Sequence, residues 1–345
     1  MLDFTNFTKR EFADLIRNRA EIDREELYAE ARAVRESSYG TDVYIRGLIE
    51  ITNYCKNDCL YCGIRKGNLD AMRYRLTPEQ ILSCCEHGYE LGFRTFVLQG
   101  GEDYFFSDEL LEKIVRDIKR CFPDCAVTLS LGEKEYDSYL RFFEAGADRY
   151  LLRHETANPL HYSLLHPKEM SHAHRLECIR NLKRIGYQTG TGFMVGSPYQ
   201  TAENLAEDLL LLKELQPEMV GIGPFLPHHA TPFAHEAGGT VELTLFMLAL
   251  IRLLLPFSLL PSTTALGTLD PARGRQRGIL AGANVVMPNL SPSDVRSKYM
   301  IYDNKNTATE TADYLVQLKR EMHEIGYQVV TSRGDCNGGR RMMND

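Results

Sequence analysis

The sequence predicts an α/β protein built as a single (β/α)8 barrel, of the TIM type. Runs rich in β-forming residues alternate with helix-like segments, and this alternation implies parallel strands joined by helical crossovers. Eight such runs lie between residues 43 and 288. Eight units in about 280 residues fit a closed barrel better than an open doubly wound sheet. No linker rich in proline, glycine or serine divides the series, so we expect one barrel rather than two domains.

The elements are expected in the following order. Residues 1–40 place apolar side chains at helical spacing between charged ones, which predicts an N-terminal helical extension. The barrel is expected over 41–325 and a C-terminal tail over 326–345. The eight strands are expected at residues 43–52, 94–99, 126–131, 149–154, 187–195, 219–224, 258–263 and 283–288. In such a barrel the chemistry lies at the carboxyl ends of the strands, so each motif can be tested by its position.

Composition excludes several classes of protein. The 345 residues carry 40 basic and 47 acidic side chains, a net charge of −7, which argues against a polybasic surface for nucleic acid or membrane. The most apolar stretch, 245–261, is interrupted by Arg252 and Pro256 and is shorter than the ~20 residues of a spanning helix. The first residues lack the apolar core of a secretory signal, so we expect the nine cysteines to be reduced thiols in the cytoplasm.

Three cysteines form the most specific motif. Cys55, Cys59 and Cys62 have the spacing C-x3-C-x2-C directly after the first expected strand. Three thiolates in one short loop can converge on a single metal centre, and thiolates select zinc or an iron–sulfur cluster. A structural zinc site needs four protein ligands, and no fourth cysteine or histidine is nearby in the sequence. A 4Fe–4S cluster held by three cysteines, with one iron left open, is therefore favoured over zinc or a chance grouping of thiols.

This loop resembles that of the radical S-adenosylmethionine (SAM) enzymes, with Tyr61 in the aromatic position that lies near the SAM adenine in that superfamily. The resemblance implies that SAM binds the open iron through its amino and carboxylate groups. It also implies that an electron from the reduced cluster cleaves SAM to methionine and a 5′-deoxyadenosyl radical. The cofactors expected are thus one 4Fe–4S cluster and SAM.

Residues at later strand ends are candidates for SAM binding. The pair Gly100-Gly101 before Glu102 lets a ligand approach the backbone, and the resemblance assigns this Gly-Gly-Glu motif to the methionyl amino group; an ordinary turn is the alternative. Glu155 can accept both ribose hydroxyls, unless it forms a structural salt bridge. Arg175 can pair with the SAM carboxylate, unless it is solvated. An adenine wall is expected from Met219 and Ile222.

A closer resemblance covers residues 44–292 and is carried by phrases such as YIRGLIEITNYCKNDCLYCGIRKGN, DRYLLRHETANP, TGTGFMVGSPYQT, GIGPFLPHHATPF and LLPSTTALGT. It is to the FeFe-hydrogenase maturase family HydE, a relative of biotin synthase and methylornithine synthase. The likeness implies an anion-binding interior lined by Arg46, Gln99, Thr128, Ser130, Arg153, Thr263 and Thr264. From the residues alone, Arg46 and Arg153 point into a barrel, where an unpaired charge is costly. An anionic ligand would remove that cost, and a structural ion pair with Glu50 or Glu155 is the alternative.

The resemblance implies a maturase of the hydrogenase active site, the H-cluster, whose radical acts on a small iron–cysteine precursor with carbonyl and cyanide ligands. The implied supplier is the maturase HydG, and contacts with other maturases and an electron donor are transient. A sister enzyme of the methylornithine synthase or biotin synthase type is the alternative, and a non-catalytic zinc-bound scaffold is the alternative from another class. Many HydE proteins carry three further cysteines near the C-terminus, but none occurs here between Cys178 and Cys336, so a second cluster is not expected. We expect a monomer.

Overall fold

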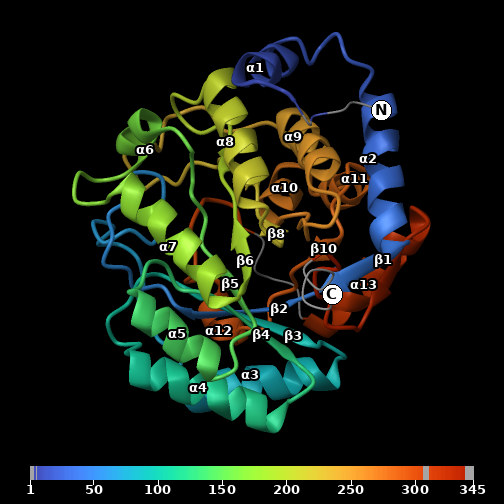
Figure 1. The fold of residues 1–345 in the computed structure, drawn as a ribbon. Helices are drawn as coiled ribbons and strands as arrows, with labels where there is room; N and C mark the ends of the chain where they lie inside the picture. The colour runs from blue at the N-terminus through green and yellow to red at the C-terminus, as the bar shows by residue number, and fades with distance from the viewer. Residues whose placement is uncertain (1–3, 5, 306–310, 339–345) are drawn as a thin grey trace.

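The computed structural model describes residue 4, residues 6–305 and residues 311–338. Strands lie at the centre of the molecule and helices surround them (Figure 1). The described strands are β1 (Asp42–Ile45), β2 (Gly47–Thr52), β3 (Thr95–Gly100), β4 (Ala126–Ser130), β5 (Arg149–Leu151), β6 (Gln188–Thr191), β7 (Met194–Val195), β8 (Met219–Val220), β9 (Gly223–Pro224), β10 (Val285–Val286) and β11 (Gln328–Val330).

The strands close into a barrel. Six parallel strands pair in the order β2-β3-β4-β5-β6-β8, and β1 pairs with both β10 and β11. β1 and β2 are one chain segment interrupted at Arg46. The circle is completed by single bridges from Met219 to Leu259 and from Pro261 to Val285. The predicted (β/α)8 architecture is therefore confirmed, with residues 258–263 joined through isolated bridges instead of a regular strand.

Several expected strands are shorter or divided. The expected run 187–195 becomes β6 and β7, and the run 219–224 becomes β8 and β9. Gly192 explains the first division, because its φ of +154° and its closeness to a neighbouring carbonyl do not fit regular strand geometry. The expected tail contains β11, which extends the sheet beside β1 and which the sequence pattern did not indicate.

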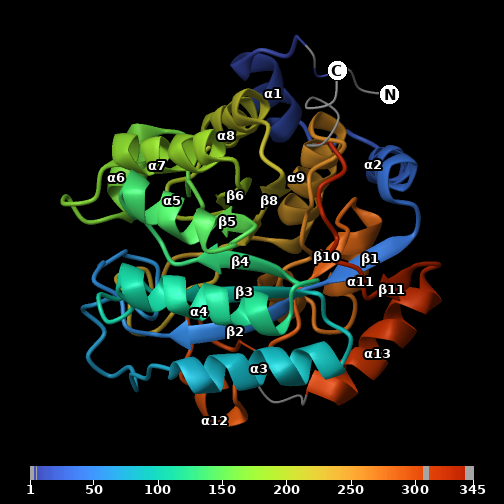
Figure 2. The same cartoon turned by 60° about the horizontal axis from the view of Figure 1, so that its bottom comes forward.

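Helices cover the outer face of the strands (Figure 2). The N-terminal extension forms two of them, one packing on α8 and the other on α9. The helices bury the apolar side of their sequence against the strands or, for α1 and α2, against α8 and α9, and this packing supplies most of their stability. Their bounds are α1 (Lys9–Arg17), α2 (Arg24–Tyr39), α3 (Pro78–Glu90), α4 (Asp108–Cys121), α5 (Tyr136–Glu144), α6 (Pro159–Leu165), α7 (His172–Ile185), α8 (Ala202–Leu215), α9 (Val241–Leu254), α10 (Thr264–Leu269), α11 (Gly274–Leu280), α12 (Ser293–Arg296) and α13 (Thr311–Glu324).

The two faces of the strands differ in character. Strand register places Glu50, Gln99 and Ser130 side by side, and side chains two residues apart share a face, so these three point to the barrel interior. Their outward neighbours, such as Leu98 and Leu129, are completely buried under the helices. By contrast the inward Gln99, Ser130, Leu151 and Met287 keep part of their surface exposed. These four positions, near the carboxyl ends of their strands, are therefore partly open to solvent.

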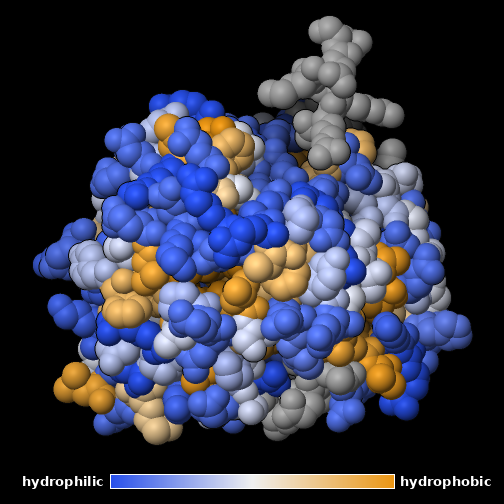
Figure 3. Space-filling view, turned by 90° about the horizontal axis from the view of Figure 1, so that it is seen from below, coloured by the Kyte–Doolittle hydropathy of each residue, from blue (hydrophilic) through white to orange (hydrophobic). Residues whose placement is uncertain are grey.

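The outer surface is mixed. The face over α3, α4 and α5 shows hydrophobic side chains in separate patches between larger hydrophilic areas (Figure 3). In the described part of the chain, no helix combines the length and apolarity needed to cross a lipid bilayer.

Candidate functional site

The cysteine loop follows β2 at the carboxyl end of the barrel. Cys55, Cys59 and Cys62 are each partly exposed, and none is in a disulfide. The Cys62 N–H donates to the Cys59 carbonyl at 3.3 Å, which turns these two residues back on each other. The Lys56 N–H donates to the Glu102 carbonyl at 2.8 Å, so the loop is fastened to the end of the neighbouring strand.

The three sulfur atoms are not arranged around a single small ion. They do not all lie within 4.8 Å of one another, as the ligands of a single small ion would. A zinc ion with Zn–S bonds of about 2.3 Å would hold them roughly 3.8 Å apart. Burial raises the pKa of the Cys62 thiol to about 12, and burial with the neighbouring thiols raises that of Cys59. Ligation must therefore displace protons, as for any thiolate metal site.

Close packing explains the glycine pair beside this loop. A Cβ on Gly101 would lie 2.2 Å from the Tyr54 carbonyl oxygen and 2.7 Å from the Cys55 Cβ. A Cβ on Gly100 would lie 2.8 Å from a methyl carbon of Thr52. Gly101 is thus required by the position of the cysteine loop itself.

Ion pairs surround the loop. The buried Glu102 pairs with Lys56 at 3.2 Å, and its Oε1 accepts the Glu133 N–H at 3.1 Å. Glu133 in turn lies 2.5 Å from the guanidinium of the buried Arg175. Burial would lower the pKa of Arg175, but the adjacent Glu133 carboxylate raises it. Arg175, expected to be free for a ligand or solvated, instead has a protein carboxylate as partner.

Glu155 is held in a strained conformation at the end of the β5 segment. Its φ is +66°, uncommon for a residue with a side chain, and strain of this kind is often found at binding sites. The Glu155 N–H donates to the Gly192 carbonyl at 3.0 Å, and its Oε2 lies 3.1 Å from the Arg153 guanidinium. Arg153 therefore forms the ion pair with Glu155 that the sequence left as the alternative. The Glu155 carboxylate belongs to this pair through Oε2.

A buried pair, His154 and Asp208, supports the turn that carries Glu155. His154 Nε2 lies 3.2 Å from Asp208 Oδ1, and His154 Nδ1 lies 2.9 Å from the Thr191 hydroxyl. Burial lowers the pKa of His154 to about 3 and raises the pKa of Asp208. Both shifts in pKa disfavour the charged forms. The Ala157 N–H also donates to Asp208 Oδ1 at 2.6 Å, so the pair fixes the backbone on both sides of Glu155. Sequence reasoning missed Asp208 because it lies more than fifty residues along, on α8.

The apolar wall near the cysteine loop comes from residues that the sequence did not single out. Tyr61 packs with Leu165, Met194, Phe225 and Phe233. Its hydroxyl is 3.2 Å from His166 Nε2, and burial lowers the pKa of this histidine to about 3, so the ring is neutral. No local pattern marks Met194 or Phe225, since the fold alone brings them to Tyr61.

The two expected wall residues lie elsewhere. Met219 packs in a separate cluster with Tyr39, Tyr44 and Leu259, and its Sδ is 2.9 Å from Arg46 Nη1. Ile222 is almost fully buried in the main core. The structure thus does not bring Met219 to the loop of Tyr61.

Most of the expected interior residues share the inward face. Arg46 is buried, and among the described residues its Nε and Nη2 have no hydrogen-bond partner. The Thr128 hydroxyl is likewise unpaired within this part of the chain, and Gln99 donates to the Tyr299 hydroxyl at 3.4 Å. Glu50, the other expected partner of Arg46, is paired with Lys305. The expectation that Arg46 and Arg153 together offer free charges to an anion is therefore corrected. Among the described residues Arg46 has no carboxylate partner, whereas Arg153 pairs with Glu155.

The two threonines of the seventh strand have different surroundings. Thr263 is the N-cap of α10, where its hydroxyl accepts the Leu266 N–H at 3.4 Å, and it lies close to Gly223. Thr264 is exposed and begins the helix. Neither residue lies in a strand, so strand alternation does not set their directions; the start of α10 does.

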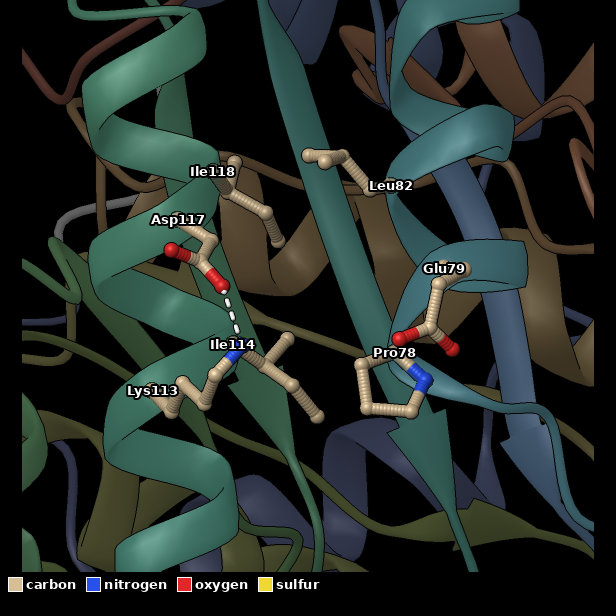
Figure 4. Close-up of a pocket in the computed structure, with 7 residues that line it drawn as sticks. All are labelled: Pro78, Glu79, Leu82, Lys113, Ile114, Asp117 and Ile118. Carbon is tan, nitrogen blue, oxygen red and sulfur yellow. Dashed lines mark hydrogen bonds and ion pairs between the residues drawn. The ribbon is translucent and has the colours of Figure 1, made fainter.

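Two other features lie outside the interior. A groove between α3 and α4 is lined by Pro78, Glu79, Leu82, Lys113, Ile114, Asp117 and Ile118 (Figure 4). It is on the outer side of the barrel, remote from the cysteine loop. His228, His229 and Asp303 converge within 4.8 Å. The His228 Nδ1 accepts the Ala230 N–H at 3.1 Å, so its proton lies on Nε2 and that nitrogen is not prepared to bind a metal.

Comparisons with known proteins agree with this geometry. Residues 49–212 match the Radical SAM superfamily. The chain is 46% identical over 301 residues to the [FeFe] hydrogenase maturase subunit HydE of Thermotoga maritima, covering 87% of this chain and 85% of that protein. It is 28% identical to 3-methylornithine synthase of Methanosarcina acetivorans, over 87% and 84% of the two chains.

Solved structures show the same fold. Methylornithine synthase (PylB) superposes with a TM-score of 0.76 at 23% identity, covering 94% of both chains. The maturase HydG of Carboxydothermus hydrogenoformans superposes with a TM-score of 0.77 at 19% identity, covering 94% of this chain and 76% of that one. At this identity the two structures establish the barrel alone. The thiol loop, the barrel and the extent of the sequence match together place the chain in the HydE family of radical SAM enzymes.

Proposed function

We propose that this enzyme acts on a small, iron-containing anionic precursor inside the barrel during assembly of the FeFe-hydrogenase active site. The observation that carries the substrate assignment is Arg46, a buried guanidinium whose Nε and Nη2 have no hydrogen-bond partner among the described residues. An unpaired buried cation costs several kcal/mol, and an anionic substrate would offset that cost. The 46% identity to a HydE protein supports this choice over the methylornithine synthase and biotin synthase types.

Cys55, Cys59 and Cys62 would hold one 4Fe–4S cluster, and the iron without a protein ligand would bind SAM. When bound there, this pair supplies a 5′-deoxyadenosyl radical. The chain's own part is to orient SAM. Glu155 offers a carboxylate for the ribose, and the polar edge formed by Gly100, Gly101 and Glu102 faces the methionyl end.

The apolar side of the SAM site is assigned to Tyr61 together with Met194 and Phe225, because these residues pack beside the cysteine loop. Arg175 is already paired with Glu133, so it could bind the methionyl carboxylate only while it also binds Glu133. We therefore assign Arg175 mainly to fixing Glu133 and, through it, Glu102.

The substrate would lie deeper in the barrel, between the cysteine loop and Arg46. Gln99, Thr128, Ser130 and Thr263 supply polar groups on the same inward face, and Arg153 reaches it while paired with Glu155. The precursor is proposed to be an iron–cysteine species with carbonyl and cyanide ligands. Contacts with other maturases and an electron donor would be transient, and we place the enzyme in the cytoplasm.

The test uses two variants of the anaerobically reconstituted enzyme. Arg46→Met should keep four irons per chain and normal SAM binding, yet abolish maturation of hydrogenase. Cys59→Ala should lose the reduced-cluster EPR signal and SAM cleavage together. If Arg46→Met matures hydrogenase normally, or loses SAM binding, the separate substrate site is wrong. One zinc and no iron per reconstituted chain would instead favour a zinc-bound scaffold.

A further inference from the structure

We propose that residues 333–337 form the floor of the barrel, and that Asp335 restricts the substrate site to ligands with a single negative charge beside Arg46. This inference rests on the proposed function, because it concerns the same interior site. It goes beyond it by assigning a role to a segment that follows the last strand of the barrel, outside every motif discussed above.

The segment is built into the end of the barrel opposite the cysteine loop. Gly334 has a φ of +59°, and a Cβ there would lie 2.7 Å from the ring of Tyr44 on β1. The Cys336 N–H donates to Gln188 Oε1 at 3.1 Å, and the Cys336 thiol donates to the Phe257 carbonyl at 3.0 Å. The segment thus contacts residues from separate parts of the barrel wall and covers the space between them.

Arg149 connects this floor to the interior. It is completely buried, and its register with Thr128 on β4 places it on the inward face. Its guanidinium donates to the Thr95 hydroxyl at 3.1 Å, to the carbonyls of Arg333 and Gly334 at 3.0 and 3.2 Å, and to Asp335 Oδ1 at 2.7 Å. Its Nε also donates to Gln188 Oε1 at 3.4 Å. Three of these five contacts come from the floor segment, so Arg149 is satisfied by the protein, mainly by the floor, and not by a ligand.

Arg46 lies close to the same group. Gly47 pairs with Phe96, so the preceding residue, Arg46, is level with Thr95, the residue to which Arg149 donates. Burial lowers the pKa of Arg46 and the charge on Arg149 lowers it further, whereas Asp335 raises it. The three side chains are therefore electrostatically coupled.

The distribution of partners sets the charge that remains. Asp335 pairs with Arg149 and with Arg333, and Arg333 also pairs with Asp148 at 2.9 Å. Within the described residues, Arg46 is left as the guanidinium of this group without a carboxylate. Asp148 also pairs with Lys119 of the outer helix α4, at 3.3 Å, so that cation does not belong to the interior. Among the described residues of the inward face Arg46 is the one uncompensated cation, and one cation matches a monoanion. Without the Asp335 charge, two adjacent guanidiniums would face the interior, and a dianion would be preferred.

The experiment compares acetate with sulfate as probes on reconstituted enzyme with an oxidised cluster and saturating SAM, using isothermal titration calorimetry. The wild type should bind acetate more tightly than sulfate. Asp335→Asn, which keeps the shape of the side chain, should shift the ratio of the two dissociation constants toward sulfate by about tenfold or more, the worth of one charge-assisted hydrogen bond. The double variant Arg149→Gln with Asp335→Asn removes one charge of each sign and should restore the wild-type ratio. It also serves if the single variant fails to fold.

The outcomes separate this inference from the function on which it rests. An unchanged ratio in Asp335→Asn, together with loss of both probes in Arg46→Met, would overturn the role of Asp335 and leave the interior anion site intact. If Arg46→Met binds both probes as the wild type does, the interior site is wrong and the charge rule falls with it. A shifted ratio that the double variant does not restore would also overturn the charge argument.

Discussion

Replacement of Arg46 by methionine is expected to stabilise the protein while it removes the function. In the free enzyme Arg46 is 5% exposed, and two of its guanidinium nitrogens, Nε and Nη2, have no partner among the described residues. The third guanidinium nitrogen, Nη1, donates only to the sulfur of Met219, at 2.9 Å. A methionine of similar length keeps the packing on that sulfur and removes the buried charge.

The magnitude follows from the missing partners. Each unsatisfied buried donor costs about 1–3 kcal/mol, and replacing buried ionic groups by apolar ones of similar volume has stabilised proteins by about 1–4 kcal/mol. We therefore expect Arg46→Met to raise the free energy of unfolding by about 2 kcal/mol. With a urea m-value of roughly 3 kcal/mol/M, the unfolding midpoint would rise by about 0.7 M.

Arg252→Met is the matched control. Arg252 is equally buried, but its guanidinium donates to the carbonyls of Gly282 and Pro256 and to Asn284 Oδ1, at 2.8, 2.7 and 3.2 Å. Its loss leaves buried acceptors without donors, so unfolding should become easier by about 3–5 kcal/mol. The assay is anaerobic urea unfolding of the reconstituted enzymes. If Arg46→Met lowers the midpoint, or matches the loss in the control, then Arg46 is satisfied in the free enzyme and the reasoning is refuted.

Three further predictions concern the loop and the floor. Gly101→Ala should lose most of its iron on reconstitution. The new Cβ would lie 2.2 Å from the Tyr54 carbonyl oxygen, so the cysteine loop would have to move; normal iron content would contradict this. Glu133→Gln should destabilise the enzyme by about 3 kcal/mol in urea, since Arg175 keeps its charge but loses its carboxylate, and an unchanged midpoint would show another partner. Burial alone would raise the pKa of Asp335, but the hydrogen bond from Arg333 and the charge on Arg149 lower it. Its stabilising contribution is therefore complete above the unfolded pKa of about 3.9 and is lost as the pH falls below that value. Asp335→Asn should flatten the dependence of the free energy of unfolding on pH between about pH 4 and 2. A dependence as steep as that of the wild type would refute this.

Periodicity was sufficient to predict the barrel, and local chemistry was sufficient to single out the three thiols that we propose as cluster ligands. Strands and helices alternate in the spacing of apolar and polar side chains, which can be read from the sequence alone. The three thiols of the loop are close in sequence, so they too can be recognised without knowing the fold. The resemblance, not periodicity, placed Gln99, Thr128 and Ser130 in the interior, and the strand register puts Gln99 and Ser130 side by side on the inward face.

Pairing between distant residues was decided by the tertiary structure alone. Arg46 and Arg153 look alike at the sequence level, yet one is unpaired and the other binds Glu155. Arg149 carried no sequence signal, but its partner Asp335 arrives from 186 residues away. Which carboxylate reaches which guanidinium depends on closure of the barrel, since ion pairing requires contact within a few ångströms and no periodic pattern encodes that distance. The sequence by itself therefore determined the fold and predicted the metal ligands. The tertiary structure decided which buried guanidinium is left without a carboxylate among the described residues.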